Sequence, residues 1–244
     1  RHDSHGELVK RSLKAGKNVF VEKPLCLKKS ELIDIRNFYA SDMTNKPKLM
    51  IGFNRRFSPL ITQLKKQISK TKSQKAFIYI CNSNLISKDH WLNNQVEGGG
   101  RLIGEACHFV DLLRYLADSS IVHLTVSELV EKNQISETFT IQINFADGSI
   151  GTIHYLSNGN RSYPKERLEV FASGGVLQLD NFRRLRGFGW PGFGKMNLWR
   201  QDKGQRACVD AFVRSVRNRE SSPIPFDEIL EVARVSIELG NSLK

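Results

Sequence analysis

Residues 3–25, DSHGELVKRSLKAGKNVFVEKPL, decide the fold because they combine a helix, a stop signal and a short buried strand. Ser4 followed by Glu7 predicts a capping box at the start of the helix. Gly16 predicts its end in a left-handed conformation. Residues 18–21, with sequence NVFV, predict the strand that follows. The segment therefore indicates the later part of a βαβ unit whose first strand lies before residue 1.

The tripeptide Glu22-Lys23-Pro24 follows this strand at its carboxyl end. In open α/β sheets ligands bind at that edge, because the loops that leave the strands line a crevice there. The alternation continues with a predicted helix at 30–41, Ser30 being its N-cap, and a strand at 48–52. We therefore expect a ligand-binding loop in the first part of the chain.

From Ala76 onward the pattern changes to β-rich sequence, because apolar residues alternate with polar ones between 138 and 145. We expect the C-terminal part of a Rossmann domain at residues 1–55. An α+β domain with an open, mostly antiparallel sheet is expected at 56–244, so the fold class is α/β. The other expected elements are a helix at 59–68, strands at 150–156, 168–171 and 176–179, and helices at 204–217 and 226–243.

Composition limits the function classes. The chain has 244 residues, 40% of them apolar, and a net charge of +12. Its basic residues are spread along the whole sequence without a nucleic-acid-binding motif, so we expect no nucleic-acid partner. Four cysteines without CxxC spacing predict neither a metal site nor a disulfide framework. No membrane-spanning segment or secretory signal is expected, which favours the cytoplasm.

Two side chains are candidates for proton transfer. Lys23 lies at a strand end, where partial burial lowers a lysine pKa toward the useful range. His108 lies on a helix that follows the triple glycine 98–100, and Asp111, three residues on, can hydrogen-bond one ring nitrogen. The alternatives are a surface lysine and a histidine that caps or packs the helix.

Three further residues are candidates for binding a substrate. The guanidinium groups of Arg55 and Arg56 suit carboxylate or phosphate groups. A solvated helix start is the alternative for both arginines. Tyr163 lies in the connection between the two predicted hairpins, where it could line the edge of a pocket.

The chain as a whole resembles the Gfo/Idh/MocA family of oxidoreductases, which includes glucose-fructose oxidoreductase and inositol dehydrogenase. The resemblance rests on residues 3–25 with the EKP motif, on GFNRRF at 52–57, on the GGG loop at 98–100 and on HFVD at 108–111. GFNRRFSPL together with the C-terminal segments DKGQRACVDAF and SSPIPFDEI is most similar to a subgroup found with polysaccharide and lipopolysaccharide synthesis.

The resemblance implies an NAD- or NADP-dependent oxidoreductase that acts on a hydroxyl or carbonyl group of a sugar, polyol or nucleotide sugar. Lys23 and His108 would manage the substrate proton during hydride transfer. Glu22, Lys23, Pro24 and His5 would contact the cofactor, with the Lys23-Pro24 bond in the cis form. Arg55, Arg56, Asp111 and Tyr163 stay the candidates for the substrate. The C-terminal sheet would mediate a homo-oligomer.

Two departures from the family pattern matter. Many relatives carry an aspartate four residues before the catalytic histidine, where this chain has Gly104. Glu105 is adjacent, but in an α-helical turn it points about 100° away and is not expected to substitute. No G-x-G-x-x-G opens the sequence, so we expect this chain to be truncated at its N-terminus and inactive alone. The alternative function is a non-catalytic sugar-binding or oligomerisation module of the same descent.

Overall fold

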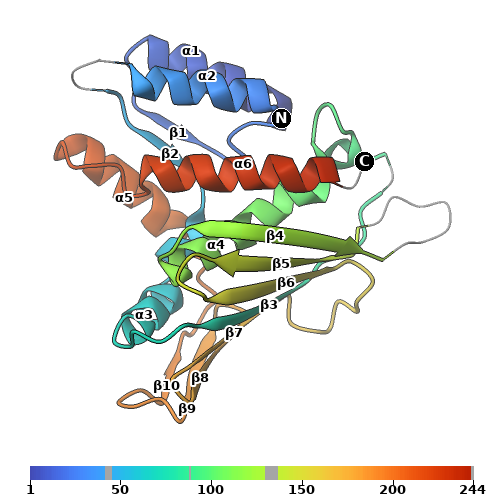
Figure 1. Cartoon of the computed structure of the whole chain (residues 1–244), viewed down its shortest axis with the longest axis vertical. Coiled ribbons are helices and arrows are strands. Elements are labelled where there is room, and N and C mark those ends of the chain that lie inside the picture. The colour runs from blue at the N-terminus through green and yellow to red at the C-terminus, as the bar shows by residue number, and fades with distance from the viewer. Residues whose placement is uncertain (42–45, 88, 130–136, 243–244) are drawn as a thin grey trace. The chain divides into compact units, whose positions relative to one another are not determined.

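The computed structural model describes residues 1–41, 46–87, 89–129 and 137–242, which form two compact units (Figure 1). Unit 1 comprises residues 1–53, 87–111 and 206–244, and unit 2 comprises residues 54–86 and 112–205. The predicted division of the chain at residue 55 stays a prediction of domain organisation. The two units likewise divide near residue 53, but unit 1 also contains two later segments of the chain.

Unit 1 is built on two short parallel strands, β1 (Val19–Val21) and β2 (Leu49–Ile51). They are joined through helix α2 (Lys29–Ala40), as parallel strands require a crossover connection. Helix α1 (His5–Lys14) precedes β1. This order confirms the predicted α/β alternation, and it brings the carboxyl ends of β1 and β2 to the same edge.

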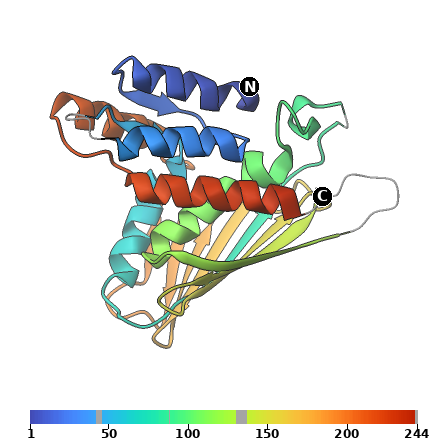
Figure 2. The ribbon, with the colours of Figure 1, turned by 45° about the horizontal axis from the view of Figure 1, so that its top comes forward.

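The long helices of unit 1 lie side by side. Helix α2 lies between α1 and α6 (Phe226–Ser242) in both views (Figures 1 and 2), and α6 also contacts β2. Apolar side chains on α6 at helical spacing are buried here, among them Ile229, Val232 and Val235. The last helix before α6 is α5 (Gln205–Arg217). Residue 243, the predicted end of α6, lies outside the described residues.

The predicted capping box at the start of α1 is wrong. Residues His2–Ser4 form a 3-10 turn, and the Ser4 hydroxyl donates to the Arg1 carbonyl instead of accepting from the helix. Gly16 ends this helix region at φ +69, as predicted. Helix α2 does start with a capping interaction, but the backbone amide of Lys28 donates to Glu31 and the predicted N-cap Ser30 lies inside the helix.

Unit 2 contains an eight-stranded sheet in the order β10-β9-β8-β7-β3-β6-β5-β4. Among the described strands of this sheet only the neighbours β3 and β6 are parallel, so the sheet is mostly antiparallel and the predicted fold class is confirmed. The strands are β3 (Ala76–Asn82), β4 (Ile121–Glu128), β5 (Phe139–Phe145), β6 (Ile150–Leu156), β7 (Glu166–Ala172), β8 (Gly175–Asp180), β9 (Arg184–Phe188) and β10 (Lys195–Asn197).

One face of this sheet is buried, as the alternation of apolar residues predicts. Phe139 and Tyr155 stack across β5 and β6 with ring centroids 4.9 Å apart. Helix α3 (Pro59–Ile68) also buries an apolar side, and the half of α4 (Cys107–Ala117) that belongs to unit 2 brings Leu113 against Gly151 of β6.

Candidate functional site

Lys23 lies directly after β1, where the sequence predicted a ligand-binding loop. Its ammonium donates to the Gly104 carbonyl at 2.7 Å and to the Glu105 carboxylate at 2.6 Å. The lysine side chain is 16% exposed and that of Glu105 32% exposed, so this ion pair is only partly solvated. The Lys23-Pro24 peptide bond is cis, as expected. Burial and two fixed acceptors make a surface role for Lys23 the weaker interpretation.

The residues that hold Lys23 belong to a π-helix, Leu102–Ala106, which leads directly into α4. A π-helix has i→i+5 hydrogen bonds, so each turn contains more residues than an α-helical turn and the side chains change direction. The expectation that Glu105 would not take the place of an aspartate at position 104 assumed an α-helical turn, and that assumption is wrong. The structure brings this carboxylate into direct contact with the predicted catalytic lysine.

Gly104 has no room for a side chain. A Cβ atom built there would lie 2.8 Å from Leu92 Cδ1 and 2.9 Å from His2 Cε1. His2 Nδ1 donates to the Gly98 carbonyl at 2.8 Å, and burial lowers the pKa of His2 below its ordinary value. A mostly neutral imidazole therefore occupies the space beside Gly104, and the carboxylate near Lys23 comes from Glu105.

His108 lies in the first turn of α4, three residues after Glu105, so one continuous helical segment carries both side chains. The imidazole is buried, and its ring lies 6.2 Å from that of Phe53 in an edge-on arrangement. Asp111 is buried on the same helix, one turn further on. The predicted hydrogen bond between His108 and Asp111 stays a prediction, as does the catalytic role of His108.

Three of the four expected cofactor-binding residues, Glu22, Lys23 and Pro24, directly follow β1, and the fourth, His5, begins α1. A Cβ atom on Gly52, just after β2, would lie 2.9 Å from Glu22 Oε2, so the glycine makes room for this carboxylate. His5 Nδ1 donates to the Pro24 carbonyl at 2.7 Å and so ties α1 to the loop after β1.

The pKa of the Cys208 thiol is raised to about 12. Burial is the main cause, and the negative charges of Glu22 and Asp111 add to it.

Arg55, a predicted substrate-binding residue, forms an ion pair with a side chain of the protein itself. Its guanidinium forms a bidentate pair with Glu166, with Nε–Oε2 at 2.7 Å and Nη2–Oε1 at 3.0 Å. Lys203 Nζ lies 2.6 Å from the same carboxylate, and the Tyr79 hydroxyl donates to it. All four groups belong to unit 2 and most of their polar atoms face one another, which favours a structural role for Arg55.

The sequence analysis missed Glu166 as the centre of this cluster. Burial alone would raise the pKa of Glu166, but the charges and hydrogen bonds of Arg55 and Lys203 outweigh it and lower the pKa to about 2. The sequence does contain a signal for it, because Glu166 and the buried residues Leu168 and Val170 occupy every second position and so lie on the same face of the strand. A carboxylate on a buried face requires a charged partner.

Two other predicted substrate residues, Arg56 and Tyr163, also belong to unit 2. Arg56 is buried with its guanidinium carbon 5.0 Å from the centre of the Tyr115 ring, a cation–π contact. Tyr163 is one of the residues that line a cavity of about 240 Å³ on strands β7, β8 and β9. Their roles toward a substrate stay predictions.

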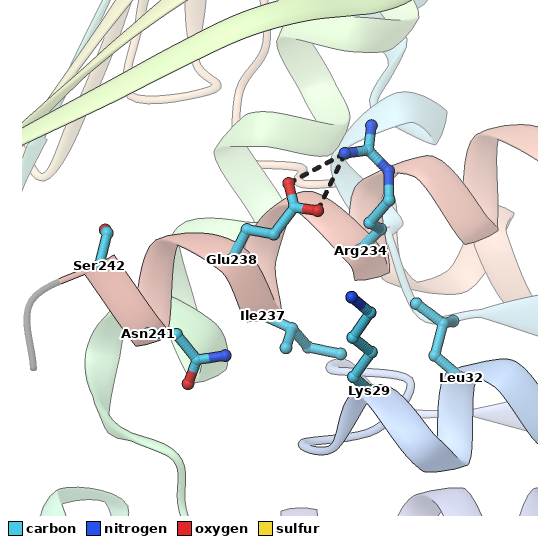
Figure 3. A pocket seen from close by; sticks show the side chains of 7 residues that line it. All are labelled: Lys29, Leu32, Arg234, Ile237, Glu238, Asn241 and Ser242. Carbon is cyan, nitrogen blue, oxygen red and sulfur yellow. Dashed lines mark hydrogen bonds and ion pairs between the residues drawn. The ribbon is translucent and has the colours of Figure 1, made fainter.

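A second cavity, of about 330 Å³, lies between α2 and α6 in unit 1 (Figure 3). Lys29 and Leu32 of α2 point toward Ile237 of α6, and Arg234, Glu238, Asn241 and Ser242 of α6 complete the lining. Arg234 forms an ion pair with Glu238, with 2.9 Å between Nη1 and Oε2. None of the predicted site residues lines this cavity.

The described ranges contain neither a metal-binding cluster nor a membrane-spanning helix. Between residues 1 and 242, leaving out the three undescribed stretches, no group of three or more histidine, cysteine or acidic residues could hold a metal ion. Across the same ranges, no helix has the length and apolar character needed to cross a membrane. All four cysteines are described, buried and free of disulfides.

Comparison with known proteins gives the chain its relatives. Residues 76–178 match the family model of the GFO/IDH/MocA C-terminal domain. The myo-inositol 2-dehydrogenase of Thermotoga maritima is 29% identical over 193 residues, which cover 74% of this chain and 54% of that protein. The inositol 2-dehydrogenase of Rhizobium meliloti is 27% identical over 187 residues, covering 74% and 55%. The chain thus spans about half the length of these curated relatives.

A solved structure agrees with the fold. The aldose-aldose oxidoreductase of Caulobacter crescentus, complexed with glycerol, has a TM-score of 0.81 and 18% identity, and the match covers 100% of this chain and 76% of that one. Fold and site together define an α/β protein with a lysine at a strand end and a mostly antiparallel second sheet. The match of residues 76–178 to the GFO/IDH/MocA C-terminal domain confirms the resemblance seen in the sequence.

Proposed function

We propose that this chain is part of an NAD- or NADP-dependent oxidoreductase that acts on a hydroxyl or carbonyl group of a sugar, polyol or nucleotide sugar. The names of its relatives, inositol 2-dehydrogenases among them, support this substrate class. The activity is proposed for a polypeptide that contains this chain, since the chain spans about half of those relatives.

The observation that carries the proposal is the setting of Lys23. An ammonium group has three N–H donors. The Gly104 carbonyl and the Glu105 carboxylate take two of them, and the described residues give Lys23 Nζ no further hydrogen bond. The third N–H donor of the Lys23 ammonium is therefore available to a substrate oxygen. Two fixed acceptors orient the group and reduce the reorganisation that catalysis requires.

Glu105 and His108 complete the proton-handling group in this proposal. Glu105 contacts the lysine and is partly exposed, so it connects Lys23 to solvent and can return or remove a proton. His108, three residues along the helix, acts on the substrate hydroxyl or carbonyl as a second acid or base. Gly104 leaves no competing carboxylate on the preceding residue.

The residues at the carboxyl ends of β1 and β2 fit the nicotinamide end of a dinucleotide. Gly52 has no side chain and so leaves space for the Glu22 carboxylate, which can accept from an amide or a ribose hydroxyl. His5 holds the loop at Pro24, beside Lys23. When bound, the cofactor accepts or supplies a hydride at the nicotinamide ring. The proposal leaves the choice between NAD and NADP open.

Several wider assignments belong to the same proposal. Residues 1–55 would end a Rossmann domain, and residues 56–244 would bind substrate and form a homo-oligomer through the sheet. We place the protein in the cytoplasm and in the polysaccharide-biosynthesis subgroup. Arg56, Asp111 and Tyr163 stay candidates for contacting the substrate, and the pair with Glu166 gives Arg55 a structural role.

The test measures nicotinamide reduction with myo-inositol, aldoses and nucleotide sugars, in this chain and in a version extended upstream of Arg1. Lys23→Met and His108→Asn are expected to lower kcat by about 10²–10⁴-fold in the active form. Glu105→Gln is expected to lower kcat more than it changes KM and to shift the pH profile. Lys10→Met, which removes a partly exposed lysine paired with Glu7 and Asp34, is the matched control and leaves kcat unchanged.

Two results would contradict the proposal. If neither form bound NAD(H) or NADP(H), the non-catalytic sugar-binding or oligomerisation module would be the better interpretation. The extended form could be active while Lys23→Met has the same kcat as Lys10→Met. That result would support the oxidoreductase class but contradict the catalytic role assigned to Lys23.

A further inference from the structure

The cavity on strands β7, β8 and β9 is chemically distinct from the site around Lys23, and its lining lies wholly within unit 2. Its volume is about 240 Å³. The lining side chains are those of Tyr163, Arg167, Gln178, Asp180, Arg184 and Arg186, with Pro164 at the edge. Three guanidinium groups and one carboxylate share this small space, so the cavity carries a net positive charge.

The strand register explains why these residues meet. In the strand register, Asp180 of β8 lies opposite Arg167 of β7 on one side and opposite Arg184 of β9 on the other. Gln178 is likewise opposite Arg186. Side chains two apart on a strand share one face, and directly opposite residues on neighbouring strands lie about 5 Å apart. The two cross-strand rows therefore place the cavity residues on one face of the sheet.

Part of the lining is held in position by a neighbour. Glu169 lies 3.2 Å from Arg167 Nε and accepts from Gln178 Nε2 at 2.8 Å. Arg167 Nη1 also donates to the Tyr163 hydroxyl at 3.4 Å. One side of the cavity is thus pre-organised, which lowers the entropic cost of binding a ligand there.

The other side offers unused donors. Within the described parts of the chain, the side chains of Arg184 and Arg186 make no hydrogen bond or ion pair, and both residues are exposed. Each guanidinium has five N–H donors in a planar fork that matches phosphate. Two such groups beside a fixed third, Arg167, form a site for a doubly charged oxyanion.

We propose that this cavity binds the phosphate ester of a small polyhydroxyl compound, such as a monosaccharide phosphate. Arg184 and Arg186 take the phosphate oxygens. Asp180 is the acceptor for hydroxyl groups, because a carboxylate accepts from O–H donors and repels phosphate. The Gln178 carbonyl oxygen and the Tyr163 hydroxyl are further partners for the hydroxylated ring.

Size and shape favour such a ligand over a larger anion. Pockets that enclose drug-sized molecules measure about 300–1,000 Å³, so a cavity near 240 Å³ suits a single phosphorylated ring. A nucleic acid strand requires an extended positive groove with stacking side chains. This cavity instead measures about 240 Å³ and has the carboxylate of Asp180 in its lining.

The experiment is calorimetric titration of the whole chain with glucose 6-phosphate, inorganic phosphate and glucose, without cofactor. The ester is expected to bind at one site, phosphate more weakly, and glucose not measurably. Arg184→Gln with Arg186→Gln should weaken the ester by at least about tenfold, because two charge-assisted contacts are lost. Asp180→Asn should weaken the ester and leave phosphate binding unchanged or stronger.

The matched control removes the same charge elsewhere. Arg161→Gln with Arg183→Gln also lowers the net charge by two, but neither residue lines the cavity. This control is expected to bind the ester almost as the parent chain does. The absence of saturable ester binding, or equal weakening in both double variants, would overturn the proposal. Since no turnover is measured, the result is independent of the proposed oxidoreductase activity.

Discussion

Replacing Glu166 with glutamine is expected to destabilise unit 2 by about 3 kcal/mol at neutral pH. The pKa of this carboxyl falls from its ordinary 4.5 to about 2 in the folded chain. One pKa unit corresponds to about 1.4 kcal/mol, so the lowered pKa represents about 3 kcal/mol of stabilisation. Glutamine leaves Arg55 and Lys203 without their buried counter-charge, and such a loss costs about 3–5 kcal/mol in other proteins.

The pH dependence has a definite sign. Because the pKa of Glu166 is lower in the folded state, its stabilisation is complete above about pH 4.5 and is lost as the pH falls toward about 2. The deficit of Glu166→Gln relative to the parent chain should therefore shrink over that interval. Urea unfolding followed by circular dichroism at several pH values measures the free energy of unfolding directly.

Glu169→Gln is the matched control for this prediction. Glu169 belongs to the same strand and also pairs with an arginine, but its side chain is 24% exposed. Its replacement is expected to cost less than about 1 kcal/mol, since solvent screens the pair. Equal losses for Glu166→Gln and Glu169→Gln, or a deficit that stays constant on acidification, would refute the reasoning.

Three shorter predictions follow. Gly104→Ala should lower the free energy of unfolding by about 1–3 kcal/mol, because its methyl group would collide with His2 and Leu92. Gly194→Ala, with open space around it, is the control. Burial raises the pKa of Cys26 and of Cys208 to about 12, so iodoacetamide should alkylate both far more slowly than in urea-unfolded chain, and rapid native labelling would contradict this. Glu238→Gln, which breaks an exposed pair on α6, should change the urea-unfolding free energy by less than about 0.5 kcal/mol, and a larger loss would show that solvent screens this pair poorly.

Local patterns predicted most of the regular structure. The helix at 59–68 and the strand at 150–156 were predicted with the bounds that the structure has. Both have an apolar face with a single period, so neighbouring residues alone contain the signal. Strands β4, β9 and β10 were not predicted. Leu185 is the one buried residue of β9, so the strand has little apolar alternation, and its position depends on pairing with β8, which is a non-local interaction.

The candidate site was predicted only in part, for the same reason. Lys23 was identified because a strand-end motif is a local feature. Its contact with Glu105 depends on a π-helix more than 80 residues away in sequence, and no rule for α-helical spacing could predict it. The pairing of Arg55 with Glu166 joins residues 111 positions apart, so the sequence suggested a ligand where the fold supplies a protein partner.

Unit 1 is assembled from three separate stretches of the chain, and this has a consequence for biosynthesis. Helix α6, the last element, contacts both α2 and β2 near the start. A ribosome adding about 5–20 residues per second needs on the order of ten seconds or more to go from β2 to α6. Throughout that interval the nascent N-terminal strands lack their apolar cover, so chaperones that shield emerging polypeptides have a defined period in which to act on this protein.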